Sequence, residues 1–371
     1  MTGKADPWSD GTVGAEPGNP WDDRSLDDEA WAAQPQLESD TAEWREPSSP
    51  VHSPARPVAD APQPRPARVD SKPTAARSAE QVEKPRKRWR SLFKGRTADA
   101  DHFPDEALKE SVRRPLPTPR TIAFINEGGG TGKTTSALLL GLTLASLRGG
   151  PIVAVDASPG CGDLANRVPA PKTPAGTVST VVDRAAQITT YEDLRKHTNT
   201  LSDGLDVLAA DSSMSADAVF TGAAYEKLVA LLRRHYELVI TDCAAGMVSD
   251  VVSAVLDDAD VVVIVSEGGD GVRSSTWTAN WMLEHAQRNP RYKQLLDDAV
   301  VVVNSRHDRT NANTAKIVDF YRGVVRAVVE LPFDQHLEGG NIVEMKRLSP
   351  ATRHQLARFA GAVMAASGID G

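Results

Sequence analysis

Beyond residue 119 the chain alternates short apolar runs with longer amphipathic segments. The apolar runs are rich in Val and Ile, and they include residues 152–155, 238–240, 261–265 and 300–303. Continuous runs of this kind are typical of strands that are buried on both faces. Their alternation with helix-length segments predicts an α/β fold: a doubly wound, mostly parallel sheet covered by helices on both sides.

The last amphipathic segment covers residues 350–366. Leu356, Phe359 and Val363 recur there at helical spacing, and few cations accompany them. This pattern predicts a helix that packs on the core of the domain, because a helix on a membrane surface would carry more Lys and Arg.

The first 116 residues have a different composition. They hold most of the prolines, and no period of 3.6 or 2 is sustained among them. Such a segment buries too little apolar surface to offset the entropy of ordering a chain. We therefore expect two parts: a disordered Pro-rich arm over residues 1–116 and one folded domain over residues 117–371.

Composition excludes several classes of protein. No run approaches 18 apolar residues, and the first residues contain no apolar segment of the secretory type. The only cysteines are Cys161 and Cys243, too few for a disulfide framework or a Cys-based zinc site. The sequence thus predicts a cytoplasmic protein. Its net charge of −8 disfavours nucleic-acid binding by the whole surface.

A glycine-rich loop over residues 127–135, EGGGTGKTT, carries the strongest chemical signal. An apolar strand precedes it and a helical segment follows it. Backbone N–H groups of such a loop cradle phosphates at a helix N-terminus, the lysine reaches the terminal phosphates, and the next hydroxyl binds Mg²⁺. The predicted nucleotide-binding residues here are Gly129, Gly130, Thr131, Gly132, Lys133, Thr134 and Thr135.

Two carboxylates follow predicted strands. Asp156 ends the run that begins at residue 152, and Asp242 ends the run that begins at residue 238. The carboxyl ends of parallel strands face the ligand crevice of such a fold. We predict that Asp242 holds Mg²⁺ together with Thr134, and that Asp156 lies near the attacking water. Lys133, Asp156 and Asp242 are the predicted catalytic residues.

The stretches INEGGGTGKTT, VDASPGCGDLA, VITDCAAGM and VVVNS occur in this order. Together they resemble the MinD/ParA branch of deviant-Walker P-loop ATPases. DASPGCGDLANR, VLAADSS, DGVRSS and LPFDQHLEGG resemble most the MinD-like proteins of actinobacterial type VII (ESX) secretion loci. The resemblance implies ATP and Mg²⁺ as cofactors, an ATP-dependent homodimer, slow hydrolysis and a positional switch. It also implies that Asn304 reads the adenine base, with Pro332 near that base.

Three positions depart from that family's pattern. The signature lysine falls on Gly128, the second carboxylate of Asp-x-Asp falls on Ser158, and the expected proline falls on Ala244. The first two changes remove a cation and a water-orienting group. We therefore expect nucleotide binding with weakened hydrolysis. Arg273 is a candidate replacement cation, and a surface ion pair is the more frequent role for such an arginine.

The arm carries two motifs. Residues 86–96, from Arg86 to Arg96, interleave cations with Trp89, Leu92 and Phe93. Four interpretations stay open: contact with an anionic membrane, binding to nucleic-acid phosphates, contact with the acidic first 50 residues of the arm, and a solvated run of charge. Tryptophans 8, 21, 31 and 44 stand in acidic surroundings, which suits a protein partner.

The prediction for function is a Mg-ATP-binding switch with weak ATPase activity, which positions or regulates a secretion, division or partition machine. One alternative is a non-hydrolysing nucleotide-binding scaffold. The other is a DNA-segregation ATPase, which the basic segment favours and the net charge of −8 disfavours. The basic segment would place the protein at the inner face of the cell membrane.

Overall fold

In the computed structural model, which describes residues 106–158, 162–171, 175–211, 220–268, 272–306 and 312–368, eight strands form one sheet. The strands are β1 (Arg120–Ile125), β2 (Ile152–Asp156), β3 (Asn199–Thr200), β4 (Leu205–Leu208), β5 (Leu238–Asp242), β6 (Val261–Glu267), β7 (Val300–Asn304) and β8 (Ala327–Leu331). Their order across the sheet is β3-β4-β2-β5-β1-β6-β7-β8, and every pairing is parallel except β3 with β4. The predicted fold class is therefore confirmed.

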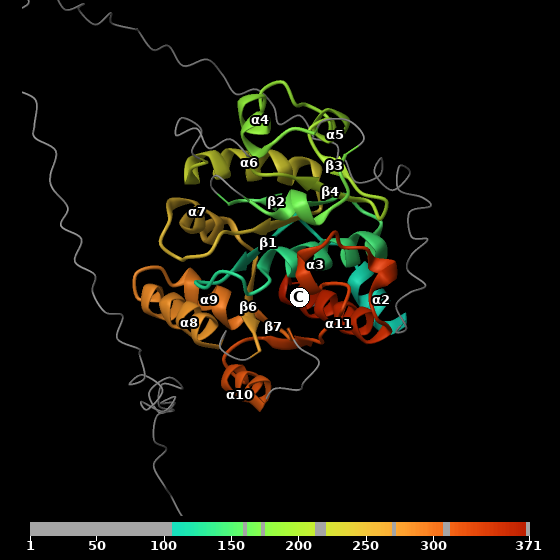
Figure 1. The fold of residues 1–371 in the computed structure, drawn as a ribbon. Coiled ribbons are helices and arrows are strands. Elements are labelled where there is room, and N and C mark those ends of the chain that lie inside the picture. Colours follow the sequence, from blue (N-terminus) through green and yellow to red (C-terminus); the bar gives the residue numbers. More distant parts are fainter. Residues whose placement is uncertain are drawn as a thin grey trace, which may run out of the picture. The chain divides into compact units, whose positions relative to one another are not determined.

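Helices cover both faces of this sheet (Figure 1). The α-helices are α2 (Glu106–Arg113), α3 (Lys133–Arg148), α4 (Val178–Asp183), α5 (Tyr191–Arg195), α6 (Gly222–His235), α7 (Asp250–Asp258), α8 (Val272–Ala286), α9 (Arg291–Asp297), α10 (Ala312–Tyr321) and α11 (Pro350–Ala366). Short 3-10 turns are η3 (Leu164–Arg167), η4 (Glu338–Gly340) and η5 (Met345–Arg347). Helices α2, α3 and α11 pack together on one face, while α6, α7, α8 and α9 cover the other.

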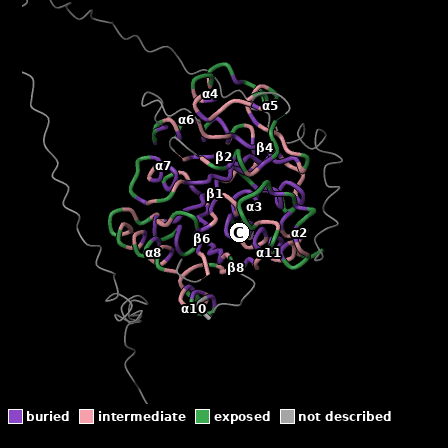
Figure 2. The backbone as a smooth tube through the Cα atoms, viewed as in Figure 1, coloured by how far each residue is buried: buried purple, intermediate pink, exposed green. Residues whose placement is uncertain are grey.

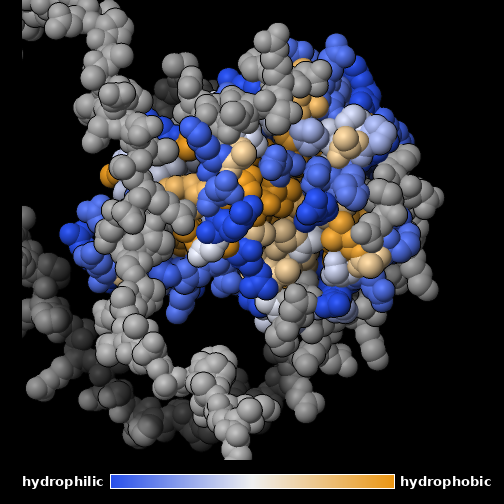
Figure 3. Space-filling model, turned by 90° about the horizontal axis from the view of Figure 1, so that it is seen from below, coloured by the Kyte–Doolittle hydropathy of each residue, from blue (hydrophilic) through white to orange (hydrophobic). Residues whose placement is uncertain are grey.

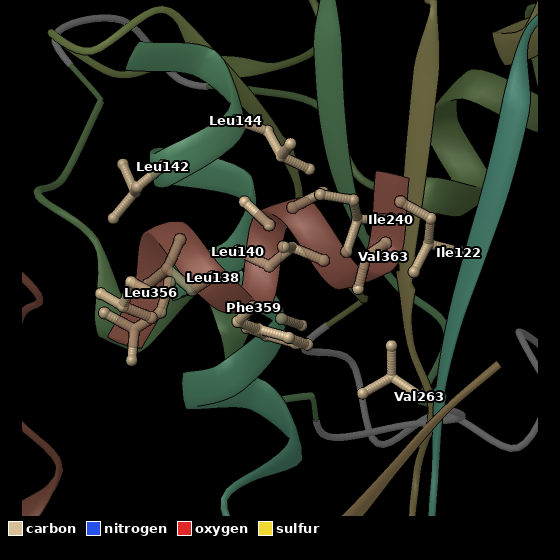
Figure 4. Packing of buried hydrophobic residues seen from close by; sticks show 14 of the residues in the cluster. Ile122, Leu138, Leu140, Leu142, Leu144, Ile240, Val263, Leu356, Phe359 and Val363 are labelled. Carbon is tan, nitrogen blue, oxygen red and sulfur yellow. The ribbon is translucent and has the colours of Figure 1, made fainter. Parts of the chain in front are cut away.

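The core lies between the sheet and the pair α3 and α11. Phe359 of α11 meets Phe124 of β1 edge-on, with ring centroids 6.2 Å apart. Figure 4 shows Leu, Ile and Val side chains of the same core near Phe359. Buried residues follow the central strands, and exposed ones lie on the outer helices and loops (Figure 2). Leu356, Phe359 and Val363 are all fully buried, so the predicted core-packing helix over residues 350–366 is confirmed.

Ordered structure begins before the predicted boundary at residue 117. Residues 106–113 form α2, and Val112 and Leu116 are buried in the same core as α3 and α11. The expectation of disorder was wrong for this stretch. Its few apolar residues, Leu108, Val112 and Leu116, stand four residues apart as on one face of a helix, and the close approach of α2 to Gly361 of α11 gives them a surface to cover.

The rest of the predicted arm, with its tryptophans and the basic segment from Arg86 to Arg96, lies outside the described residues. Among the described helices, none combines the length and the apolar character that crossing a bilayer requires.

Few large hydrophobic side chains are exposed on the described surface. They are Val248, Trp277 and Ile342, with exposed fractions of 85%, 43% and 43%. Seen from below, hydrophobic residues gather in the middle of the face and hydrophilic ones surround them (Figure 3). Val248 is the most exposed of the three, and it lies in the loop that follows β5, close to the candidate site described next.

Candidate functional site

The glycine-rich loop joins β1 to α3 at the carboxyl edge of the sheet. Gly130 and Gly132 have φ angles of +71° and +92°, which side chains other than glycine rarely adopt. Gly132 caps α3, and no side chain caps the N-terminus of that helix. The first N–H groups of α3 therefore have no side-chain acceptor, as a phosphate-binding helix start requires.

Lys133 is the first residue of α3, and its side chain folds back over the loop. Its Nζ donates to the carbonyl of Gly128 at 3.0 Å, and only 6% of the residue is exposed. Burial lowers the pKa of Lys133, while the nearby Asp242 opposes that shift. A buried cation thus lies inside the loop, where the terminal phosphates of a nucleotide were predicted to bind.

Asp242 ends β5 and is 2% exposed. Burial raises its pKa to about 7, Asp156 adds to that shift, and a hydrogen bond from the Thr134 side chain opposes it. The second carboxylate oxygen, Oδ1, is buried and has no hydrogen-bond partner among the described residues. The structure therefore brings together Thr134 and Asp242, the two residues predicted to hold a metal.

These two residues fit Mg²⁺. The ion favours oxygen ligands and binds proteins through one or two carboxylates, with waters and substrate phosphates completing its shell. An unpartnered Oδ1 on Asp242 and the hydroxyl of Thr134 supply that chemistry. Among the described residues, no group of three or more His, Cys, Asp or Glu side chains is placed to hold a metal ion.

Asp156 lies beside Asp242, because β2 and β5 pair in register at these two residues. Its oxygens accept from the N–H groups of Ser158 and Leu164, both at 3.1 Å. Burial raises the pKa of Asp156, and these hydrogen bonds counter part of the shift. In this arrangement Asp156 binds both Ser158, which follows β2, and Leu164, which begins η3. Its predicted place by the attacking water stays a prediction.

Asn304 ends β7 and contacts the phosphate loop. Its Nδ2 donates to the carbonyl of Thr131 at 2.9 Å and to the hydroxyl of Ser136 at 3.2 Å. Pro332 follows β8, whose last residue pairs with Asn304. Asn304 and Pro332 therefore lie at the same edge of the sheet as the glycine-rich loop. Recognition of the base by these two residues stays a prediction.

Comparison with solved structures supports this assignment of the fold. A ParA family ATPase from Chlorobium tepidum superimposes with a TM-score of 0.53 at 17% identity, over 66% of this chain and 98% of that one. The fold is that of the ParA/MinD ATPases. At 17% identity the likeness establishes the fold alone. No protein-family model matches the chain.

Two curated proteins are also similar to the chain. They are the ESX-1 secretion-associated protein EspI of Mycobacterium tuberculosis, strains CDC 1551 and H37Rv, each 31% identical over 268 residues. The match covers 70% of this chain and 39% of EspI, so the chain spans well under half of these relatives. The predicted resemblance to ParA/MinD ATPases and to a protein of an ESX locus is therefore confirmed.

Two arginines reach the phosphate loop of this ParA/MinD fold, and our sequence analysis named neither. Arg306 donates to the carbonyl of Gly130 and pairs with Glu267 at 2.9 Å. Arg167 donates to the hydroxyl of Thr135 at 2.8 Å. Arg306 follows the predicted site residue Asn304 by two positions, and this spacing is the only sign of its contact in the sequence. Nothing near residue 167 indicates the contact that Arg167 makes.

Helix α8 packs against the start of the glycine-rich loop. The Asn126 side chain donates to Ser274 at 3.0 Å and accepts from Thr278 at 2.9 Å. A Cβ atom on Gly128 would lie 2.7 Å from the Cβ atom of Ser274. The position of the ParA/MinD signature lysine is therefore closed to any side chain unless α8 shifts. Arg273, the candidate replacement cation, is an exposed residue of the same helix.

Proposed function

We propose that the chain binds Mg-ATP at its phosphate loop and works as a nucleotide-dependent switch. The observation that carries this proposal is the buried pair of Lys133 and Asp242 on a glycine-rich loop that opens a helix. A cation and a carboxylate buried together cost free energy, and bound phosphate with Mg²⁺ would supply each with an opposite charge. The ParA/MinD fold supports the same conclusion.

Calorimetric titration with Mg-ATP tests the proposal. We expect binding to the wild type and a loss of affinity of about 100-fold or more in Lys133→Ala, because a buried cation that contacts phosphate is removed. Lys293→Ala is the matched control, since Lys293 is an exposed lysine paired with Asp297 on α9. Equal affinity in the wild type and Lys133→Ala would contradict the proposal.

Hydrolysis is a separate question, and the second candidate function is a scaffold that binds ATP without splitting it. Both oxygens of Asp156 are engaged by backbone N–H groups, and position 128 has no room for a lysine. Single-turnover hydrolysis at saturating enzyme separates the two. A weak ATPase gives slow phosphate release that Asp242→Asn abolishes, whereas a scaffold releases none above that variant.

For the biological role, we propose that the switch positions or regulates a secretion machine. EspI, an ESX-1 secretion-associated protein, supports that context. In this proposal the tryptophan-rich acidic arm binds a protein partner, and the segment from Arg86 to Arg96 contacts anionic membrane. Flotation with vesicles that contain anionic lipid tests the second contact. Binding that survives deletion of residues 86–96 would refute it.

The proposed switch is a change of oligomeric state. Val248 is 85% exposed in the loop after β5, next to the phosphate loop, and an apolar side chain so placed suits a contact between two copies across their nucleotides. Light scattering after gel filtration tests this. We expect a dimer with a non-hydrolysable ATP analogue and a monomer with ADP, and Val248→Glu should weaken the dimer.

A further inference from the structure

Glu127 occupies the first position of the phosphate loop, directly after β1 and Asn126. Its side chain turns toward the loop that follows β5, where its Oε2 accepts from the N–H group of Met247 at 3.0 Å. Its backbone carbonyl accepts from the N–H group of Gly246, also at 3.0 Å. One residue thus binds two consecutive donors of the neighbouring loop.

Those two donors belong to the loop after β5, which turns at Gly246. Gly246 has a φ of +100°, and a Cβ atom added there would meet nothing within 4 Å. Its N–H group also lies 3.3 Å from the carbonyl of Asn126. The N–H groups of residues 246 and 247 are therefore both engaged by residues 126 and 127.

Consecutive N–H groups beside a cation form an anion site. The cation here is Lys133, and Glu127 is one of the negative groups whose charge acts on it. A terminal phosphate bound in this loop would compete with Glu127 for the charge of that lysine and for the N–H group of Met247. The carboxylate of Glu127 therefore holds one donor, the N–H group of Met247, that the last phosphate of a triphosphate would use and that a diphosphate does not need.

We infer that Glu127 is a specificity-determining residue that stands in for the terminal phosphate and biases the site toward nucleoside diphosphate. A triphosphate binds only after the carboxylate releases Met247, so the loop after β5 moves when the terminal phosphate arrives. This inference rests on the proposed nucleotide-binding function. It gives the switch a physical basis, since one anion replaces another on the N–H group of Met247.

The side chain of Glu127 can be changed without removing the contacts that its backbone makes. The N–H group of Glu127 donates to Thr278 of α8 at 2.9 Å, and Gly246 binds only its backbone carbonyl. Replacing the side chain leaves both of these contacts. Glu127→Ala removes the charge and the acceptor, while Glu127→Gln removes the charge and keeps an oxygen that accepts from Met247.

The experiment is a calorimetric titration of full-length wild type, Glu127→Ala and Glu127→Gln with Mg-ADP and with a non-hydrolysable Mg-ATP analogue. Glu237→Gln is the control, because Glu237 directly precedes the opposite end of β5, where it accepts from Arg148 at 3.3 Å. In Glu127→Ala we expect the analogue to bind about tenfold tighter, the effect of one charge-assisted hydrogen bond, with ADP affinity unchanged. Glu127→Gln should lie between the wild type and Glu127→Ala.

An unchanged ratio of the two affinities in Glu127→Ala would overturn the inference and leave the proposed function standing, since both nucleotides would still bind. An equal change for ADP and for the analogue would also overturn it, because Glu127 would then act only on the shape of the loop. Absence of binding by either nucleotide in every protein would overturn the proposed function, and the inference with it.

Discussion

Two buried ionisable side chains, Lys133 and Asp242, lie near each other at the phosphate loop. Burial favours the neutral form of each side chain. It lowers the pKa of Lys133 and raises the pKa of Asp242 to about 7. Groups perturbed in this way are typical of functional sites, because the ligand supplies the charges that the fold withholds. The chemistry of this site is thus decided by a few side chains, and they can be tested singly.

The pKa of Asp242 predicts a pH dependence of stability. Because that pKa lies above the ordinary value of 3.8, the folded chain retains a proton between pH 3.8 and about 7 that the unfolded chain has released. The stabilising contribution is complete below that range and is lost as pH rises through 7. In thermal melts without Mg²⁺, the wild type should lose more stability between pH 5 and pH 8 than Asp242→Asn does.

The expected difference is on the order of a few kcal/mol, and Asp156 leaves part of the slope in the variant because burial also raises its pKa. Added Mg²⁺ should stabilise the wild type more at pH 8 than at pH 6, since a metal binds the ionised carboxylate. An equal loss of stability between pH 5 and pH 8 in the wild type and in Asp242→Asn would contradict this prediction.

At the scale of single elements, α8 and α11 each help to hold the carboxyl edge of the sheet. Helix α8 fills the space at Gly128 with Ser274. Helix α11 starts at a cap that includes Asp334, whose carboxylate accepts from the N–H group of Ser349 at 2.8 Å and from the Thr352 hydroxyl at 2.7 Å. That carboxylate ties the segment after β8 to α11, and with it the predicted base-binding Pro332.

Gly128→Ala should destabilise the fold by about 1–3 kcal/mol, because the added methyl group would overlap Ser274. Ser274→Gly has a cost of its own, since it removes the acceptor for Asn126. Made together, the two changes should cost less than the sum of the single costs, because the overlap is gone. Urea unfolding of the four proteins measures this coupling, and strict additivity would show that α8 does not restrict position 128.

Asp334→Asn should destabilise the fold by about 2 kcal/mol at pH 7. Burial alone would raise the pKa of Asp334, but hydrogen bonds from Ser349, Thr352 and His336 outweigh burial and lower it. A lowered pKa means that the stabilisation is present above the unfolded value of 3.8 and is lost as pH falls below it. The difference between wild type and variant in urea should therefore shrink at pH 3. Asp298→Asn, at the exposed ion pair with Arg326, is the control and should change little.

At the scale of the whole molecule, the folded part extends N-terminally to include α2. Arg113 donates to the carbonyl of Leu147 at 3.0 Å, and Arg148 donates to that of Arg114 at 2.9 Å, so α2 and the end of α3 hold each other. Val112 and Leu116 add apolar burial to the core that α3 and α11 share. The N-terminal helix is therefore a structural part of the ATPase-like domain.

Two truncations test this. A chain that starts at residue 105 should unfold at nearly the same urea concentration as one that starts at residue 84. A chain that starts at residue 118 should be less stable by about 3 kcal/mol, because two buried apolar side chains and their helix are lost. Equal stability of the chains that start at residues 105 and 118 would show that α2 contributes nothing to the domain.

Local pattern sufficed to predict the sheet, the phosphate loop, the carboxylates that end β2 and β5, and the helix over residues 350–366. Each of these features depends on residues that are close together in the sequence: the period of a strand or helix, the glycines of a loop, or the residue that ends a strand. The pattern did not predict α2, because Val112 of that helix and Leu116 just after it are buried only where α3 and α11 lie against them.

Only the tertiary structure decided which groups meet around the loop. Arg306 and Gly130 are 176 residues apart, and Glu127 and Met247 are 120 residues apart. They meet because the order β2-β5-β1-β6-β7 brings the carboxyl ends of these strands to one edge of the sheet. No local period encodes that order. The sequence by itself therefore determined that a glycine-rich loop joins β1 to α3, and the packing of distant strands determined that Glu127 binds the N–H groups of Gly246 and Met247.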